Sequence, residues 1–321
     1  MKLLSFTTKD SRRGVGVLTD DGVRVLRSIT ADEAELSISP MRTLLLQYGS
    51  DLSALHSDVS HSELFALADI RLDAPVPDPG KIIAAPVNYR DHQEEMNQDA
   101  HIDALGVFLK APSSLVPHGS TVRLPYTDRR FDQEGELALV IGKRASNVAA
   151  KDALSCVAGY TLLLDITMRG GEDRSTRKSF DTFTPMGPFL VTPDEVGDLK
   201  QLNLLCSVSG TLRQDASIAD LIWGVPELIA YASSVMTLNP GDVISTGTPA
   251  GVGQIHDGQH VAVEIEGIGR LEVSVSAQGS IACPTRGAGR GPKPPEALTP
   301  LRPAELRGAT PHDFSAPRPN G

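Results

Sequence analysis

Two segments of the sequence are apolar at almost every position, and they limit the folds that are open to this chain. Residues 134–141 read EGELALVI and residues 157–164 read VAGYTLLL. Because side chains alternate across a strand, both segments predict strands that are covered on both faces. From Lys81 to about Cys283, short β-rich runs separated by Gly, Pro and Asp turns dominate, without regular strand–helix alternation. We therefore expect an α+β, predominantly β domain.

The first 75 residues predict a small N-terminal α/β unit. Asp21-Gly22 separates two short apolar runs, which is a hairpin signal. Short helices are expected over residues 39–49 and 62–70. The proline-rich stretch LDAPVPDPG, residues 72–80, then predicts a stiff linker into the next domain.

Residues 76–284 predict a second, larger domain, and residues 285–321 predict a tail of a different kind. The domain contains one clear amphipathic helix over 220–236, with Pro226 tolerable only near its start. The tail holds eight prolines and five glycines with few large apolar residues. Such a composition cannot bury enough surface to offset the entropy of ordering. We therefore expect the tail to be disordered and dispensable for activity.

Charge and cysteine content narrow the class of partner. The net charge of −10 and the pI of about 5.3 disfavour binding to nucleic acid or an anionic membrane, both of which attract basic surfaces. No run approaches the ~20 apolar residues of a membrane helix, and the N-terminus turns polar too soon for a signal peptide. Three cysteines without CxxC spacing predict reduced thiols: Cys156, Cys206 and Cys283. We expect a soluble, cytoplasmic protein that acts on small molecules.

Three carboxylates lie at the ends of the two apolar strands. Glu134 and Glu136 share one face at the start of the first strand, and Asp165 follows the second. Each has an ordinary alternative, because the glutamates could be a solvated pair at a strand end and the aspartate could cap a turn. Together they offer three oxygen ligands, and no His/Cys cluster competes for a softer metal. This set favours Mg²⁺ or Mn²⁺, with Ca²⁺ as a further candidate.

Two more groups of polar residues could take part in catalysis or ligand binding. His92 and Glu95 are spaced i, i+3, so on a helix they share a face and the carboxylate can hold the imidazole as a general base. The alternative is a polar surface helix. Lys178 precedes a Pro/Gly-rich turn and could pair with a substrate carboxylate or enolate, or could be solvated. A Gly/Thr loop at residues 246–253 offers N–H groups to an anion but lacks nucleotide-loop spacing.

Five motifs in order resemble the fumarylacetoacetate hydrolase family. They are NYRDH followed by Glu95, FDQEGELALVIGK, GYTLLLDITMRG, RKSFDTFTPMGP and MTLNPGDVISTGTPAGVG. The likeness spans about residues 80–275 and points to the acylpyruvase and 2-hydroxyhepta-2,4-diene-1,7-dioate isomerase branch. It implies a mixed β-roll catalytic domain that forms homodimers.

The resemblance also implies roles for individual residues. The metal ligands would be Glu134, Glu136 and Asp165. The catalytic residues would be His92, Glu95 and Lys178. The substrate-binding residues would be Tyr89, Arg169, Gly247 and Thr248.

Members of this family cleave or rearrange β-dicarbonyl acids. The resemblance therefore implies a hydrolase of aromatic or sugar-acid catabolism that cleaves a C–C bond in an acylpyruvate-type acid, through a metal-stabilised enolate and water activated by the His-Glu pair. One alternative is an isomerase or decarboxylase of hydroxymuconate-type diacids or oxaloacetate. A second alternative is an inactive member that binds metal or ligand.

The chain departs from the family pattern at two places. Pro86-Val87 stands where the family often has glycine, which predicts a differently shaped entry. Gly170-Gly171-Glu172 stands where a glutamine is common, so an amide that would contact substrate is absent.

Overall fold

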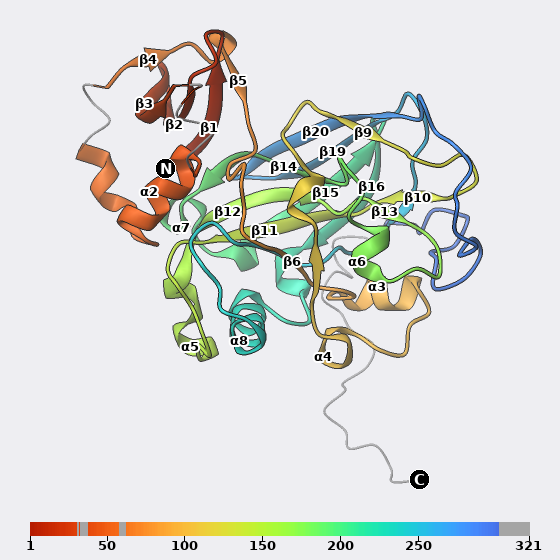
Figure 1. Cartoon of the computed structure of the whole chain (residues 1–321). Coiled ribbons are helices and arrows are strands. Elements are labelled where there is room, and N and C mark those ends of the chain that lie inside the picture. Colours follow the sequence, from red (N-terminus) through yellow and green to blue (C-terminus); the bar gives the residue numbers. More distant parts are fainter. Residues whose placement is uncertain (31, 33–37, 58–61, 302–321) are drawn as a thin grey trace.

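The structure is a computed structural model that describes all residues except 31, 33–37, 58–61 and 302–321. One large sheet runs through the described part of the chain (Figure 1), and helices pack on both of its faces, because Met41 shares a core with Ala138 on one face and Leu228 shares a core with Leu137 on the other. In order across this sheet, the strands are β4 (Leu64–Phe65), β3 (Gly22–Ile29), β2 (Arg13–Thr19), β1 (Lys2–Thr8), β14 (Thr184–Val191), β12 (Val157–Leu164), β11 (Gly135–Ile141), β17 (Val243–Ser245), β6 (Ile82–Ala84) and β7 (Phe108–Lys110). Two strands pair off this path, β5 (Ile70–Leu72) on β1 and β8 (Leu115–Val116) on β14.

The described residues also form two smaller sheets. The second sheet contains β16 (Thr211–Ser217), β15 (Asn203–Val208), β19 (His260–Ile265), β20 (Gly269–Ser276) and β9 (Thr121–Arg123). The third contains β13 (Thr167–Met168), β10 (Phe131–Gln133) and β18 (Gly253–Gln254). The α-helices are short: α2 (Pro40–Tyr48), α3 (Arg90–Glu95), α4 (Ile102–Leu105), α5 (Ala150–Ala153), α6 (Arg174–Arg177), α7 (Pro193–Val196) and α8 (Val225–Val235). The predicted α+β, predominantly β class is confirmed.

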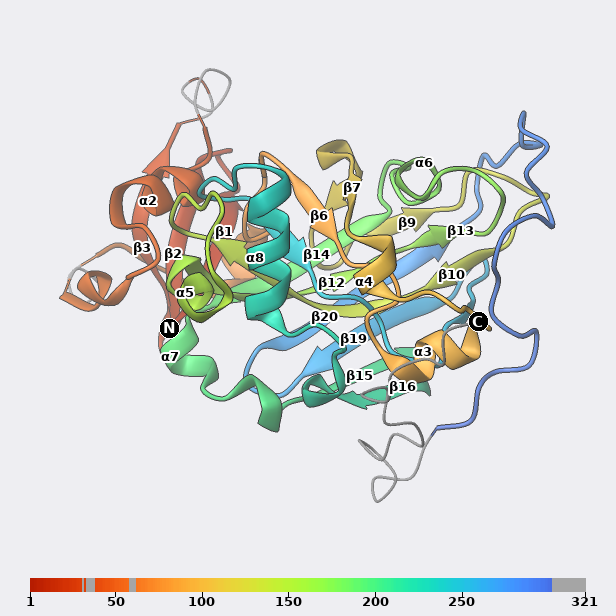
Figure 2. The same cartoon turned by 90° about the horizontal axis from the view of Figure 1, so that it is seen from below.

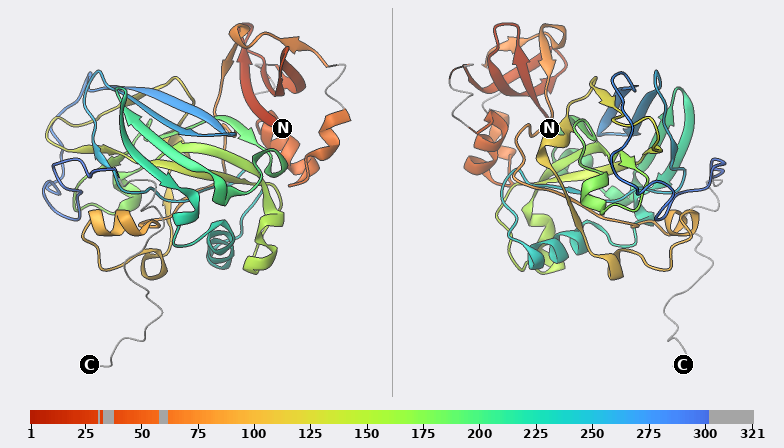
Figure 3. Two further views of the ribbon diagram at one scale, coloured as in Figure 1. Left: turned by 180° about the vertical axis from the view of Figure 1, so that it is seen from behind. Right: turned by 45° about the vertical axis from the view of Figure 1, so that its right-hand side comes forward.

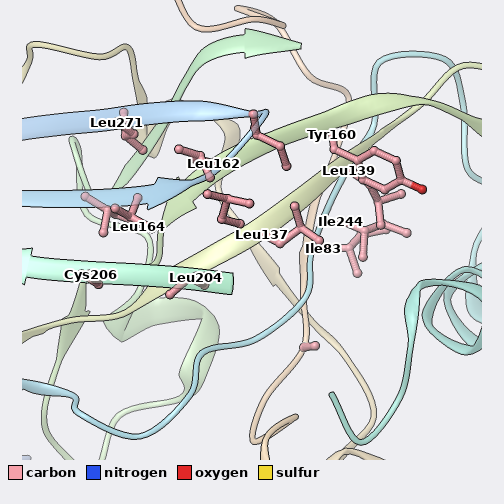
Figure 4. Close-up of a cluster of buried hydrophobic side chains, with 14 of the residues drawn as sticks. Ile83, Leu137, Leu139, Tyr160, Leu162, Leu164, Leu204, Cys206, Ile244 and Leu271 are labelled. Carbon is pink, nitrogen blue, oxygen red and sulfur yellow. The ribbon is translucent and has the colours of Figure 1, made fainter. Parts of the chain in front are cut away.

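Strands β11 and β12 are covered on both faces, as their sequences predict. On one face, Leu137 and Leu139 join a core with Leu162 of β12 and with Leu204 and Leu271 of the second sheet (Figure 4). On the other face, Ala138 and Val140 join a second core with Leu163, Met41 and Leu3. Alternate side chains along β11 therefore pack into two separate cores. A shift by one residue would exchange the two sets, so this packing fixes the register of the strand.

The N-terminal unit shares the main sheet with the rest of the chain. Strand β1 pairs with β14 through Leu3 and Leu190, so the sheet continues across the expected boundary near residue 75 (Figure 3). The predicted hairpin is confirmed, with Thr19 opposite Gly22. The helix predicted over 39–49 is confirmed as α2. The division into three parts stays a prediction.

The helix predicted over 62–70 is wrong. This stretch forms β4, a short 3-10 turn over Leu67–Asp69, and β5. Phe65 pairs with Val23 of β3 and Ile70 pairs with Thr8 of β1, so the two outer strands of the β1–β2–β3 meander hold the segment in extended conformation. The helix expected over 220–236 begins only at Val225, with Pro226 in its first turn, where the missing N–H has no cost.

Residues 285–301 differ from the disorder expected for 285–321. They run along the edge of the catalytic domain toward α3 (Figure 2). The carbonyl of Thr285 accepts from Arg129 at 3.1 Å, and the carbonyl of Gly287 accepts from the Gly171 amide at 3.0 Å. Polar hydrogen bonds hold this segment, so an argument from apolar content could not anticipate it. The remainder of the tail, 302–321, lies outside the described residues.

The predicted reduced thiols agree with the structure, in which Cys156 and Cys206 are buried and all three cysteines are free. Among the described residues, no helix is both long and apolar enough to span a membrane.

Candidate active site

Three carboxylates meet at one end of the β11–β12 pair. Gly135 lies opposite Leu164, so Glu134 and Asp165 lie side by side just beyond the paired strands, and the Asp165 amide donates to the Glu134 carbonyl at 2.8 Å. With Glu136 they offer oxygen atoms that all lie within 4.8 Å of one another. All three side chains are buried. The alternative of a solvated pair of glutamates at a strand end is therefore wrong.

Two cations that the resemblance singled out, Lys178 and Arg169, contact members of this cluster. Lys178 donates from Nζ to Glu134 Oε2 at 2.6 Å and also contacts Asp165. Arg169 donates from Nη2 to Glu134 Oε1 at 2.7 Å and from Nε to Asp132 at 2.6 Å. Lys178 is only 5% exposed, so the alternative of a solvated lysine is also wrong.

Lys110 is a third cation that sequence reasoning missed. Its ammonium group, at the end of β7, donates to Asp165 and to the Phe183 carbonyl, the latter at 2.9 Å. Burial lowers its pKa, although the charge of Asp165 acts in the opposite direction. The available signal was a lysine that closes the apolar run VFLK. Asp132 was also missed, although it lies two residues before Glu134 in the same run.

The carboxylates titrate differently because their neighbours differ. Burial raises the pKa of Glu134, but the charges of Lys178 and Arg169 outweigh it and lower the pKa well below its usual range. Burial and the charge of Asp165 raise the pKa of Glu136 to about 8. One carboxyl of the set therefore carries a proton at neutral pH while the site holds no further cation.

The Gly/Thr loop after β17 closes over Glu136. The Gly247 amide donates to Glu136 Oε2 at 2.8 Å, and the Ser245 hydroxyl donates to the same oxygen. Gly247 has a φ of +93°, and a Cβ there would lie 2.8 Å from the Cβ of Asn88. Thr248 Oγ1 donates to the Gly135 carbonyl at 2.9 Å. In this structure the Gly247 amide and the Thr248 hydroxyl therefore donate to protein groups. The substrate-binding role of Gly247 and Thr248 stays a prediction.

Helix α3 carries the His-Glu pair. His92 Nδ1 lies 2.9 Å from Glu95 Oε2, and both side chains are buried, so the reading of these two residues as part of a polar surface is wrong. The other oxygen of Glu95 accepts from the Gly251 amide at 2.8 Å. The loop after β17 links this pair to the carboxylate cluster, because its Gly247 amide donates to Glu136 and its Gly251 amide donates to Glu95. Glu95 as acceptor at Nδ1 leaves Nε2 as the basic nitrogen.

Tyr89 lies at the N-terminus of α3 and is fully buried. Its hydroxyl has no hydrogen-bond partner among the described residues. A buried hydroxyl without a partner is costly, which fits a group that is satisfied by a ligand.

The donor set fits a divalent cation. Three buried carboxylates with oxygens this close together match the ligands that hard divalent ions prefer, and they repel one another unless positive charge compensates. In this structure Lys178, Lys110 and Arg169 supply that charge.

Comparison with known proteins places the chain in a family. The model of the fumarylacetoacetate (FAA) hydrolase C-terminal domain matches residues 81–276. The chain belongs to the fumarylacetoacetate hydrolase family. Maleylpyruvate hydrolase from Aquipseudomonas alcaligenes is 46% identical over 235 residues, which are 70% of this chain and 82% of that protein. Oxaloacetate tautomerase YisK from Bacillus subtilis (strain 168) is 39% identical over 229 residues, 67% of this chain and 76% of that protein.

Solved structures of fumarylacetoacetate hydrolase family proteins share the fold. Maleylpyruvate hydrolase from Sphingobium sp. SYK-6, in complex with manganese(II) ion and pyruvate, is 35% identical with a TM-score of 0.73 and covers 86% of this chain and 99% of that chain. The 5-carboxymethyl-2-hydroxymuconate delta-isomerase from Mycobacterium smegmatis is 29% identical with a TM-score of 0.67, over 86% of this chain and 100% of that chain. The family resemblance predicted from the five motifs is confirmed.

Proposed function

We propose that this protein is a divalent-metal-dependent hydrolase that cleaves a C–C bond in an acylpyruvate-type acid, releasing pyruvate and a second carboxylic acid. The observation that carries the proposal is the buried cluster of Glu134, Glu136 and Asp165 beside the buried His92–Glu95 pair. The similarity to maleylpyruvate hydrolases, one of them solved with manganese(II) and pyruvate, supports it.

A divalent cation held by Glu134, Glu136 and Asp165 would supply positive charge that polarises the α-keto oxygen and carboxylate of the substrate. Lys178 places its ammonium group between Glu134 and Asp165, and once a cation neutralises these carboxylates the ammonium group can donate to the oxygen that becomes negative. Arg169 stays tied to Asp132 and can orient the substrate carboxylate. These groups place positive charge where the pyruvate enolate develops.

The His92–Glu95 pair acts on water. Glu95 holds the Nδ1 proton, so His92 Nε2 can accept a proton from a water molecule that attacks the distal carbonyl carbon. The C–C bond between that carbonyl carbon and the pyruvyl methylene then breaks, and its electron pair becomes the enolate. Protonation of the enolate carbon gives pyruvate, so the reaction consumes one water molecule.

A second candidate is a tautomerase or isomerase of oxaloacetate or a hydroxymuconate-type diacid. The similarity to oxaloacetate tautomerase and to 5-carboxymethyl-2-hydroxymuconate delta-isomerase favours it. The same His-Glu pair would move a proton between carbon and oxygen and would need no attacking water.

We further propose Mg²⁺ or Mn²⁺ as the working metal, because the ligand set consists of carboxylate oxygens. We also propose that the protein acts as a homodimer in the cytoplasm, in aromatic catabolism. These finer assignments rest on the ligand chemistry and the family.

The test is an assay of the purified protein with maleylpyruvate, fumarylpyruvate, acetylpyruvate, oxaloacetate and a hydroxymuconate-type diacid. Each substrate is incubated with Mg²⁺, with Mn²⁺ and with excess EDTA, and products are identified by NMR. We expect pyruvate and the matching acid from at least one acylpyruvate, and no turnover with EDTA. Tautomerised or isomerised product alone would assign the second candidate instead.

A further inference from the structure

The C-terminal segment from Thr285 to Leu301 makes a series of contacts that lead to the His-Glu pair. Arg129 binds the hydroxyl of Thr285 at 2.6 Å, and the Gly171 amide binds the carbonyl of Gly287 at 3.0 Å. Further along, Arg130 donates to the Pro294 carbonyl at 3.4 Å. Figure 2 shows this segment along the edge of the domain, ending beside α3.

The first contacts of the segment are made at Gly170-Gly171-Glu172. Glu172 binds Arg129 at 2.6 Å and accepts a hydrogen bond from the Thr285 hydroxyl. A Cβ at Gly171 would lie 2.9 Å from the Cβ of Arg290. Because Gly171 has no side chain, the segment can lie close to its backbone. Glu172 then holds the segment through the Thr285 hydroxyl.

The segment ends on Glu95. Thr299 Oγ1 donates to Glu95 Oε1 at 2.6 Å, and the Gly251 amide donates to the same oxygen at 2.8 Å. Leu298 packs over Gly253, where a Cβ would lie 2.6 Å from its Cδ2. The Glu95 carboxylate has no exposure to solvent, so these donors and His92 define its position. Hydrogen bonds to a buried carboxylate are of the stronger kind.

We propose that residues 285–301 form a strap that orients the His92–Glu95 pair, and that Thr299 is its positioning residue. The inference rests on the proposed function, because it assigns the strap to the pair that activates water. Thr299 touches neither substrate nor metal in this scheme. It fixes the Glu95 carboxylate, and Glu95 fixes the plane and tautomer of the His92 ring.

This role predicts an effect on turnover and little effect on binding. The carboxylate cluster and Lys178 lie on other elements, so a loosened Glu95 leaves the substrate's pyruvyl end in place. A misplaced general base slows the chemical step. A change in kcat with a nearly constant KM is therefore the signature of the strap.

The experiment compares matched variants of the full chain. Thr299→Val keeps the shape and removes the donor, whereas Thr299→Ser keeps the hydroxyl. We expect Thr299→Val to lower kcat about tenfold with KM changed by less than about twofold, and Thr299→Ser to retain most of the wild-type kcat. A chain that ends after Ala297 should match Thr299→Val, and a chain that ends after Leu301 should match the wild type.

Several outcomes would overturn the proposal. They are a wild-type kcat in Thr299→Val, an equal loss in Thr299→Ser, an equal loss in the chain that ends after Leu301, or a gain in turnover when the chain ends after Ala297. The last result would make the segment an inhibitor of the pair.

Hydrogen exchange tests the strap independently of the proposed function. Without the strap contact, amides of α3 should exchange faster in Thr299→Val than in the wild type, while those of β12 stay unchanged. This measurement needs no substrate. If the wild-type protein hydrolyses no acylpyruvate, the proposed function fails, but the exchange data still decide whether Thr299 holds α3. Equal exchange rates in α3 of the wild type and Thr299→Val would contradict the proposal that Thr299 positions Glu95.

Discussion

Glu134 and Glu136 are two residues apart and share a strand face, yet their environments push their pKa values in opposite directions. Glu134 accepts from Lys178 and Arg169, whose charges favour the ionised form. Among the described residues, the hydrogen-bond donors to Glu136 are the neutral Ser245 hydroxyl and Gly247 amide, and the charge of Asp165 lies nearby. Of the three carboxyl groups, Glu136 is therefore the one whose ionised form most needs a bound cation.

This difference predicts the pH dependence of metal binding. The pKa of Glu136 is raised to about 8, so below that pH a metal ion must displace its proton. Affinity for Mn²⁺, measured by calorimetry, should rise about tenfold per pH unit toward pH 8 and then level off. Glu136→Gln should bind the ion more weakly, because it lacks the charge, and should lose most of this pH slope. A flat affinity between pH 6 and 8 in the wild type would contradict the assignment.

The same pKa shift predicts the stability of the metal-free protein. A folded-state pKa above the unfolded value of 4.5 means that the folded protein binds more protons, so the contribution of Glu136 to stability is full below pH 4.5 and declines as pH rises toward 8. The lowered pKa of Glu134 has the opposite sign and acts only below its unfolded value of 4.5. Denaturant titration in excess EDTA should give a lower free energy of unfolding at pH 8 than at pH 6 in the wild type. The difference should be smaller in Glu136→Gln.

The role of His92 is tested by separating chemistry from binding. His92→Ala should lower kcat for the best acylpyruvate by about 10²–10⁴-fold, because it removes the general base. Affinity for Mn²⁺ and for pyruvate should change little, since both depend on the carboxylates and Lys178. Glu95→Gln serves as the matched variant, because it keeps the size of the side chain and removes its charge. Near-wild-type turnover by both variants would exclude the pair from the mechanism.

At the scale of elements, the sequence predicted what depends on local alternation. The two strands apolar on both faces, the hairpin at Asp21-Gly22 and the helix at residues 39–49 all follow from period and turn chemistry. The segment 62–70 was predicted wrongly, because strand pairing with β3 and β1 overrides a weak helical pattern. Lys110 could not be predicted as a partner of Asp165, since the two are 55 residues apart and only the fold brings β7 to the site.

The loop after β17 offers a prediction at this scale. Gly247→Ala should destabilise the protein by about 2 kcal/mol or more, because a Cβ would clash with Asn88 at a φ of +93° and displace the amide bound to Glu136. Affinity for Mn²⁺ should fall as well. Gly258→Ala is the control, since its φ is +77° and nothing lies within 4 Å, so it should cost only about 1 kcal/mol and leave metal binding unchanged. Denaturant titration and calorimetry check both variants, and equal effects would contradict a specific role for Gly247.

At the scale of the whole molecule, the site is assembled from segments that are distant in sequence. The carboxylates come from the β11–β12 pair, the His-Glu pair from α3, the closing loop from residues after β17, and the strap from residues beyond 284. The motifs identified most of these residues through the family resemblance. The strap was missed because its contacts are polar, and a Pro/Gly-rich composition predicts only that little apolar surface is buried.

The central claim is that water cleaves a C–C bond of an acylpyruvate at this site. The direct measurement is a reaction of the Mn²⁺-loaded protein with maleylpyruvate in H₂¹⁸O, followed by mass spectrometry of the products. We predict one ¹⁸O atom in the new carboxylate of the released maleate and pyruvate that carries no label from the cleavage step, after correction for slow ketone exchange. Isomerised or tautomerised substrate without cleavage and without labelled maleate would contradict the account.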